Sequence, residues 1–492
     1  MGSRVVERRL GKTKPHRGGP GSARWSATLL DSPRHAPEGC AMIRSPAHRI
    51  VLLTASLAAW AIPGSGGSQA RPSPEQGWEL AAELGCGGCH AGAPAPDPAR
   101  AKVPLLGPEA PPLPGDFVFE YLADPQPRRD GMGATRMPDF RLDEGERVAL
   151  ALFLGTAPTP GSTLEQARRR HPGADAERGR WIYRALGCAG CHQGVDNALP
   201  VAGPDLSREG AAAAPGWLAE YLADPTPIRG PAHPSAPGAR MPDFRLTAEE
   251  ARALSAWLAD QGRPFASPPP AQPLTRTERA RTERFLETRV SCLGCHRIAG
   301  TGGRIGPDLG GVAARRTSTY VVEIISDPGR GAPGAPMPHQ PMPAREAQRL
   351  ARLLLEDDTP PAPMSEPSLA NPAHPAWTAL DASDGTDPAA ALYARHCAAC
   401  HGSAGGGDGW NAANLPVPPT AHRDARLMST RVDDALYDGI HAGAWVLDGS
   451  NRMPAFGALL SPGEIRSLVA RIRTLCACAA PGWSDAPGGG AR

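Results

Sequence analysis

Aromatic side chains are scarce in this sequence. Only 5% of its 492 residues are Phe, Trp or Tyr, whereas glycine and proline each occur 57 times. A chain with so few aromatic residues and so many loop-forming residues has difficulty in building large cores from protein alone. We therefore expect a non-protein group to fill part of the interior.

A strong excess of charge is also missing. The 52 lysine and arginine residues nearly balance the 50 aspartate and glutamate residues, and the formal net charge is +2. Nucleic acids and acidic polymers are usually bound by strongly basic surfaces. The sequence gives no reason to expect such a partner, and no small-molecule substrate is predicted either.

Long hydrophobic runs are absent. The apolar run at residues 50–62 is short of the roughly 20 residues that a helix needs to cross a bilayer. Arg44 and Arg49 precede this run, and the small residues Ser68 and Ala70 follow it at the two positions that a signal peptidase reads. This order of basic, apolar and small residues is typical of a secretory signal peptide.

The signal peptide determines how the N-terminal region is interpreted. We expect translation to begin at Met42, residues 42–70 to form the signal peptide, and the mature chain to begin near Arg71. Residues 1–41 are then a non-native upstream extension. The mature protein is predicted to be periplasmic, and either soluble or peripherally attached to a membrane.

Cysteine usage is strongly patterned. Eight of the 11 cysteines belong to four copies of the pentad Cys-x-x-Cys-His, which are roughly a hundred residues apart. The copies are formed by Cys86, Cys89 and His90; Cys188, Cys191 and His192; Cys292, Cys295 and His296; and Cys397, Cys400 and His401. Near the C-terminus, Cys476 and Cys478 flank a single residue, and they either pair with each other or join a partner.

An internal repeat surrounds the pentads. Residues 120–146 and 220–250 share the sequences EYLADP and RMPDF, and residues 322–350 carry a looser copy. Repeats of this length define structural units. We predict four tandem domains joined by semi-rigid proline-rich linkers. Their ranges are 71–158, 164–264, 275–358 and 384–475, and a tail follows at 476–492.

Helix-capping signals lie on both sides of the pentads. Asp175 and Asp387 are the expected N-caps of the helices that precede the second and fourth pentads. Capping boxes are expected at the start of three closing helices, formed by Asp143 with Glu146, Thr247 with Glu250 and Ser461 with Glu464. The third unit has Pro343 at the corresponding position, so its helix start is less well defined.

Several kinds of site use closely spaced cysteines. A zinc ribbon needs two Cys-x-x-Cys pairs in one small unit, and each unit has only one. A redox dithiol does not require the histidine, and a disulfide that closes so short a loop adds little stability. Covalent haem uses every feature, because both cysteines form thioethers to the porphyrin and the histidine binds iron. The pentads therefore predict four covalently bound haem c groups.

Each unit resembles a class I cytochrome c domain, most closely the fourth. The resemblance rests on an N-terminal helix, the pentad, a Gly-Pro loop and a Met-Pro loop before a C-terminal helix. The Gly-Pro loops are Gly107-Pro108, Gly203-Pro204 and Gly306-Pro307. The resemblance implies a mainly α fold of four small helical domains, each wrapped round one haem. It also implies that histidine is the fifth iron ligand and methionine the sixth, namely His90 with Met137, His192 with Met241, His296 with Met337, and His401 with Met453.

The inventory of side chains supports methionine ligation in the first two units. His90 is the only histidine between residues 71 and 163, so two histidines from that unit cannot bind one iron. Met137 matches Met241 in the second unit, whereas Met132 has no counterpart and is interpreted as a loop residue. The alternatives to Met241 are His171 and His233.

The third unit leaves more than one possible ligand. An alignment without gaps places Met337 on Met241 and Met342 on an apolar packing position. Met337 is therefore favoured, with Met342 and His339 as the alternatives. In the fourth unit Met453 precedes a proline, and Met428 is interpreted as a core residue.

A thioether ligand raises the reduction potential of haem relative to two histidines, which implies a high-potential electron relay. We expect a carrier that passes single electrons between other redox proteins, such as a membrane respiratory complex or a small cytochrome. One alternative is the cytochrome subunit of a larger respiratory oxidoreductase complex. A haem peroxidase-type enzyme is the other, but it needs an open iron site, and no catalytic residue is predicted.

Overall fold

The computed structural model describes residues 73–95, 103–106, 110–125, 136–192, 203–228, 238–270, 272–362, 368–371, 374, 387–447 and 449–481. The predicted upstream extension and signal peptide lie outside these ranges. Within them, no helix combines the length and the apolar character needed to cross a membrane.

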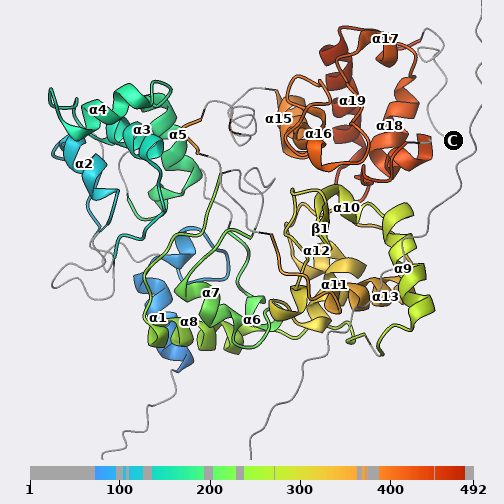
Figure 1. Cartoon of the computed structure of the whole chain (residues 1–492), viewed down its shortest axis with the longest axis horizontal. Helices are drawn as coiled ribbons and strands as arrows, with labels where there is room; N and C mark the ends of the chain where they lie inside the picture. The colour runs from blue at the N-terminus through green and yellow to red at the C-terminus, as the bar shows by residue number, and fades with distance from the viewer. Residues whose placement is uncertain are drawn as a thin grey trace, which may run out of the picture. The chain divides into compact units, whose positions relative to one another are not determined.

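The regular structure is mainly helical, as predicted (Figure 1). The two strands named in the described residues are β1 (Arg297–Ile298) and β2 (Thr301–Gly302), which form a short antiparallel pair after the third pentad. The helices surround four buried hydrophobic cores, and we call the helices around each core a lobe.

Lobe A combines segments from the first two predicted units, residues 71–158 and 164–264, which we call the first and second repeats. Its elements are α1 (Pro74–Glu83), the 3-10 turn η1 (Cys86–Gly88), α6 (Glu209–Ala212), α7 (Trp217–Ala223) and α8 (Ala248–Gln261). Helix α1 packs along α8, and Leu80, Leu254 and Trp257 belong to their common core. Gly77 permits the close crossing, because a Cβ atom there would overlap the carbonyl oxygen of Ala253.

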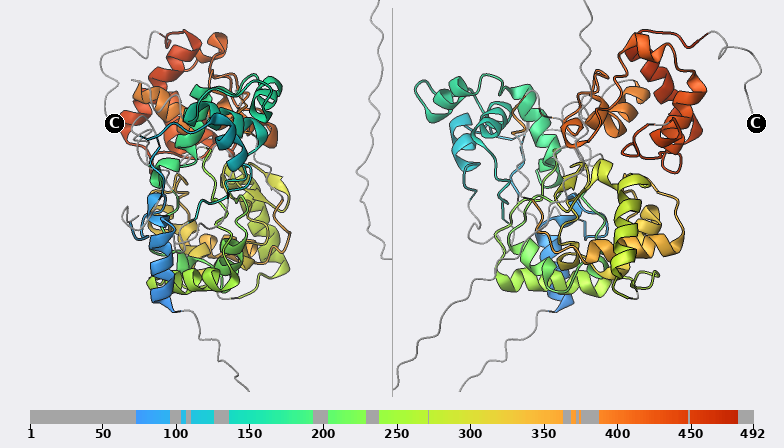
Figure 2. Two further views of the ribbon diagram at one scale, coloured as in Figure 1. Left: turned by 90° about the vertical axis from the view of Figure 1, so that its left-hand side faces the viewer. Right: turned by 45° about the vertical axis from the view of Figure 1, so that its right-hand side comes forward.

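Lobe B contains the remaining helices of the first two repeats. Its elements are α2 (Gly115–Tyr121), α3 (Glu144–Leu154), α4 (Thr163–Arg170), α5 (Ala176–Ala185) and the 3-10 turn η2 (Cys188–Gly190). Helix α3 from the first repeat packs against α5 from the second, with Val148, Ile182 and Tyr183 in one core. Each of the predicted ranges 71–158 and 164–264 therefore contributes helices to both lobes. The blue α1 accordingly lies beside the green α8 in Figures 1 and 2.

The other two lobes are each formed mainly by one stretch of chain. The third contains α9 (Arg276–Thr288), α10 (Cys292–Cys295), the two strands, η3 (Val312–Ala314), α11 (Ser318–Ser326), α12 (Pro328–Gly331) and α13 (Ala344–Leu355). The fourth contains α15 (Pro388–His396), α16 (Ala398–His401), η4 (Ala412–Asn414), α17 (Ala425–Met428), α18 (Asp433–Ala442), η5 (Ala444–Leu447) and α19 (Pro462–Cys476).

The predicted helix starts are confirmed. The Asp175 side chain accepts a hydrogen bond from a backbone N–H in the first turn of α5, and Asp387 does the same for α15. All three predicted capping boxes are present, at the starts of α3, α8 and α19. Helix α13 begins after Pro343 without a side-chain cap. The helix start that was less well defined in the sequence therefore also lacks a capping box in the structure.

Part of the proline-rich segment before the fourth lobe packs against lobe B. Leu369 and Ala370 are buried in the core of that lobe. The Leu369 N–H donates to Glu146 Oε1 at 2.8 Å, and Arg240 binds the same carboxylate at 2.7 Å. Because Glu146 is only 1% exposed, these donors compensate the cost of burying its charge. At these residues the segment is therefore anchored to a lobe.

Candidate haem-binding sites

Each pentad forms one tight turn. In all four, the N–H of the histidine donates to the carbonyl of the first cysteine: His90 to Cys86 at 3.0 Å, His192 to Cys188 at 2.8 Å, His296 to Cys292 at 2.8 Å, and His401 to Cys397 at 2.9 Å. Side chains three and four positions apart lie on the same face of such a turn. The two cysteines and the histidine of a pentad can therefore contact the same ligand.

A backbone carbonyl orients each imidazole. The Nδ1 atom lies 3.0 Å from the Pro204 oxygen in His90, 3.1 Å from Pro104 in His192, 2.8 Å from Pro307 in His296, and 2.9 Å from Thr420 in His401. A carbonyl oxygen can only accept, so Nδ1 carries the proton and Nε2 keeps the lone pair that an iron ligand needs. Burial lowers the pKa of His296 and His401, which favours the neutral imidazole.

Burial also keeps the pentad thiols protonated. It raises the pKa of Cys86, Cys188, Cys295 and Cys397 to about 12. A reactive dithiol needs a lowered pKa, so these surroundings do not suit thiol–disulfide exchange. In the described ranges, no group of three or more His, Cys, Asp or Glu residues could hold a bare metal ion.

The third lobe borders a cavity of about 860 Å³, whose lining also includes residues of lobe A. Cys292, Cys295 and His296 line it, and Met337 is part of the same lining. Met342, in contrast, packs against the core of the third lobe. Two thiols, an imidazole and a thioether on the walls of one large cavity fit a covalently attached haem.

The alternative ligands lie in other surroundings. His339 Nε2 is 3.0 Å from the Ser326 carbonyl oxygen, and His171 Nε2 is 2.8 Å from a carboxylate oxygen of Glu144. Met428 is fully buried in the core of the fourth lobe, as predicted. Met132 and His233 lie outside the described residues.

In the fourth lobe a second histidine stacks on the first. The ring centroids of His401 and His422 are 4.1 Å apart, with an interplanar angle of 12°. The His422 Nδ1 atom lies 3.0 Å from the Tyr393 hydroxyl oxygen. Met453 and Cys397 border the buried core that contains Tyr393. The predicted residues of the fourth site therefore gather around one core.

Met137 of the first repeat lies in the lobe that holds the second pentad. Met137 and Cys188 both pack against the core of lobe B, and Tyr183 belongs to that core. The Tyr183 hydroxyl donates to the His192 carbonyl at 2.8 Å, so the second pentad belongs to this lobe. The structure therefore brings Met137 to the lobe of His192. Met241 is half-buried.

The pentad turns are also neighbours in pairs. The first two approach so closely that a Cβ atom on Gly88 would lie 3.0 Å from the Gly190 carbonyl oxygen. Between the third and fourth, Asn411 Nδ2 lies 3.0 Å from the Gly294 oxygen and 3.4 Å from Cys400 Sγ. The first pair of turns thus touches directly, and the second pair is joined by one amide.

The roles of Pro104, Thr420, Asn411 and His422 in these sites were not predicted. The Pro104 carbonyl oxygen orients the His192 imidazole. The loop expected near it, at Gly107-Pro108, lies outside the described residues. Thr420 has the same role for His401, and the proline just before it was the available signal. Nothing near Asn411 in the sequence points to its role, because its partners include residues of another lobe.

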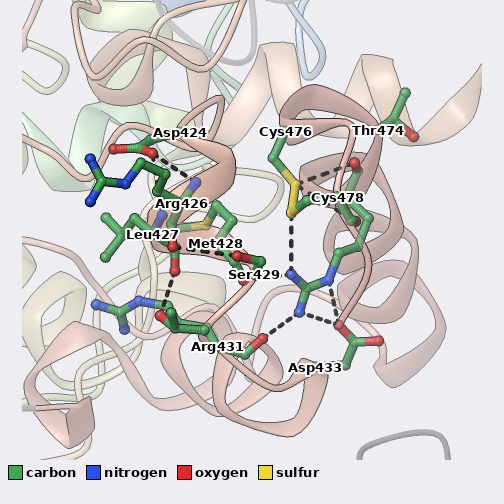
Figure 3. Close-up of a disulfide and its surroundings, with 12 residues drawn as sticks. Asp424, Arg426, Leu427, Met428, Ser429, Arg431, Asp433, Thr474, Cys476 and Cys478 are labelled. Carbon is green, nitrogen blue, oxygen red and sulfur yellow. Dashed lines mark hydrogen bonds and ion pairs between the residues drawn. A yellow bond between two sulfur atoms is a disulfide. The ribbon is translucent and has the colours of Figure 1, made fainter. Parts of the chain in front are cut away.

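The two remaining cysteines of the described chain form a disulfide at the end of α19 (Figure 3). Of the two alternatives considered for Cys476 and Cys478, the pairing within the chain is the one present. Arg473 lies beside it, with Nη1 3.7 Å from Cys478 Sγ and Nε 2.8 Å from Asp433. The same guanidinium donates to the Met428 carbonyl at 2.7 Å and thereby ties α19 to α17.

Comparison with protein families agrees with these sites. The chain matches the family model for cytochrome c over residues 176–262 and again over 266–359. Residues 384–471 match the model for cytochrome c oxidase, cbb3-type, subunit III. No curated protein and no solved structure matched the chain. The three matched segments contain the second, third and fourth pentads, and together with the helical fold they support a c-type cytochrome, whose domains imply covalently bound haem c and electron transfer.

Proposed function

We propose that this chain is an exported tetrahaem c-type cytochrome that transfers single electrons between periplasmic or membrane-bound redox partners. The observation that carries the proposal is the fourfold recurrence of one arrangement. Each pentad places two cysteines and a histidine on one turn, with the Nδ1 atom of the histidine beside a backbone carbonyl. This arrangement presents two thioether positions and one imidazole nitrogen to the same haem.

The protein residues set the properties of each site. The cysteines attach the haem, and the carbonyl fixes the tautomer and orientation of the proximal imidazole. When bound, haem iron accepts and releases one electron by cycling between the ferric and ferrous states. Methionine as the sixth ligand favours the ferrous state and therefore a high reduction potential. The proposed methionine ligands are Met137, Met241, Met337 and Met453.

The closeness of the pentads supports transfer within the chain. The turns of the first pair meet at Gly88 and Gly190, and Asn411 joins those of the second pair. The cavity beside His296 is also lined by Pro204, whose oxygen lies 3.0 Å from His90. Attachment points that share contacts in this way suit a relay that passes electrons from one haem to the next.

A second candidate function is favoured by the match of residues 384–471. The matched family is a subunit of an oxidase complex, so the chain could serve as the cytochrome subunit of a larger respiratory assembly. Purification of the chain from its native membranes under mild conditions separates the two candidates. Stable co-purification of other subunits favours the assembly, and recovery of the chain alone from the periplasmic fraction favours a free carrier.

A reductive titration followed by optical spectroscopy tests the electron-transfer proposal. The purified chain should accept four electrons, one for each haem, at high potentials. A matched variant, Cys292→Ser with Cys295→Ser, should accept three. A chain that binds haem but takes up no electrons during the titration would contradict the proposed function.

A further inference from the structure

The first two haem sites are assembled from both repeats at the histidine side. His90 of the first repeat directs Nδ1 toward the Pro204 oxygen of the second, at 3.0 Å. His192 of the second repeat directs Nδ1 toward the Pro104 oxygen of the first, at 3.1 Å. In addition, the Gly203 N–H donates to the first pentad at 2.8 Å. The loops that orient these two imidazoles are therefore exchanged between the repeats.

The helices follow the same exchange. Helix α1 leads into the first pentad and packs against α8, whereas α5 leads into the second pentad and packs against α3. A Cβ atom on Gly179 in α5 would overlap the Ala149 carbonyl oxygen in α3, just as one on Gly77 would overlap Ala253. Both crossings are therefore close-packed interfaces of the kind found inside domains.

The two Met-Pro segments cross each other between the lobes. Asp139 and Asp243 form an antiparallel bridge, with backbone hydrogen bonds of 2.7 and 2.8 Å. Arg136, before the bridge in the first repeat, binds Glu250 of α8 at 2.5 Å. Arg240, at the matching position of the second repeat, binds Glu146 of α3 at 2.7 Å. Arg136 of the first repeat thus binds the closing helix of the second repeat, α8. Arg240 of the second repeat binds the closing helix of the first, α3.

The segments that follow the two arginines contact different lobes. Met137, next to Arg136, packs against the core of lobe B. In the second repeat, Phe244 and Leu246 follow Met241 and pack against the core of lobe A. The first pentad belongs to lobe A, because Cys86 also packs against that core.

We propose that the first two haems have exchanged iron ligands, with His90 and Met241 on one iron and His192 and Met137 on the other. The inference rests on the proposed function, because it presupposes a His/Met haem at both sites. It replaces the pairing within each repeat that the order of the sequence suggests. Neither repeat then holds a complete haem site by itself, and the two form one intertwined dihaem module.

The test removes one haem and identifies the methionine whose replacement then no longer changes the optical spectrum. In the full chain with Cys86→Ala, Cys89→Ala and His90→Ala, three haems remain. Each oxidised His/Met haem contributes a sulfur-to-iron charge-transfer band in the far red. In this background we expect Met241→Ala to leave the band unchanged and Met137→Ala to remove about a third of it. The opposite result would establish pairing within each repeat and overturn the proposal.

The reciprocal background provides a matched control. In the variant with Cys188→Ala, Cys191→Ala and His192→Ala, Met137→Ala should leave the band unchanged. Met241→Ala should remove about a third of it. Met453→Ala should remove a third in either background, because the fourth site is independent of the exchange. A wild-type chain that binds haem but lacks the band would contradict the His/Met sites themselves, which separates that failure from a failure of the exchange.

Conservative variants test the exchange if the haem-deficient chains do not fold. In the haem-loaded chain, the losses in Tm caused by Arg136→Met and Glu250→Gln should not add, because these residues form one ion pair. The losses caused by Arg136→Met and Glu146→Gln should add. Additive losses in the first double variant, with non-additive losses in the second, would show that the lobes are not exchanged.

Discussion

Asn411 and Gly294 join the third and fourth lobes at their pentads, with Asn411 Nδ2 3.0 Å from the Gly294 carbonyl oxygen. The Asn411 side chain is fully buried, and its Oδ1 atom accepts a hydrogen bond from the Arg304 N–H at 2.8 Å. Its Nδ2 atom is also 3.4 Å from Cys400 Sγ. One amide thus connects the attachment turn of the fourth lobe to the backbone of the third.

Replacing Asn411 by alanine should weaken both lobes. The variant leaves the Gly294 carbonyl and the Arg304 N–H without this partner, and each such buried group costs roughly 1–3 kcal/mol. We expect the free energy of unfolding to fall by about 2–4 kcal/mol, measured by denaturant titration. Asn414→Ala, at a half-buried position three residues later, is the control and should change it by less than about 0.5 kcal/mol. Equal stability of the two variants would contradict this role for Asn411.

The two methionines of the third lobe should have separable effects. Met337 lines the cavity with His296, so Met337→Ala should remove about a quarter of the far-red band and lower one reduction potential. Met342 packs against the core, so Met342→Ala should lower the free energy of unfolding by about 1–2 kcal/mol and leave the band intact. Loss of the band in the Met342 variant alone would reverse the assignment.

Arg240 should contribute strongly to the stability of lobe B. Its guanidinium binds Glu146, whose carboxylate is 1% exposed, and Arg240→Met leaves that charge without its cationic partner. We expect a loss of about 3–5 kcal/mol, measured by denaturant unfolding. The matched control is Arg169→Met, which breaks an exposed pair with Glu165 and should cost at most about 0.5 kcal/mol. Similar losses in the two variants would contradict the buried role of Arg240.

His374 should make the protein less stable in mild acid. This residue is 3% exposed, and burial, together with Arg240 and Arg178, lowers its pKa from 6.5 to about 4. Above pH 6.5 the imidazole is neutral in both the folded and unfolded states. As the pH falls from 6.5 to about 4, the unfolded chain binds a proton that the folded chain excludes, so stability is lost.

The variant His374→Gln isolates this contribution. A shift of this size corresponds to a loss of at most about 3 kcal/mol between neutral pH and the lower end of the window. We expect the variant to lose correspondingly less stability than the wild type over that window, as measured by denaturant unfolding at each pH. The same loss in both proteins would rule out His374 as the source.

The local features of the fold could be predicted from the sequence. Capping depends on residues three positions apart, which is why the boxes at Asp143, Thr247 and Ser461 were identified correctly. The pentad turn is equally local, because its hydrogen bond joins residues four positions apart. The mainly helical fold followed from these signals together with the resemblance to cytochrome c domains.

The exchange between the first two repeats could not be predicted in this way. The sequences EYLADP and RMPDF are the same in both repeats, so Arg136 can pair with Glu146 or Glu250 without any change in the local pattern. Which pairing forms depends on packing between segments far apart in the chain, as at Gly77 and Gly179. The burial of Leu369 in lobe B has the same origin, because nothing local distinguishes it from a spacer residue.

Intact-mass measurement of the exported chain under denaturing conditions tests the central claim most directly. Thioether bonds survive denaturation, so only covalently attached haem adds to the mass. The account predicts a single species that begins near Arg71 and carries four haem increments. Variants with Cys→Ser at both cysteines of any one pentad should carry three. A wild-type mass with fewer than four increments would contradict the assignment of four haem c sites.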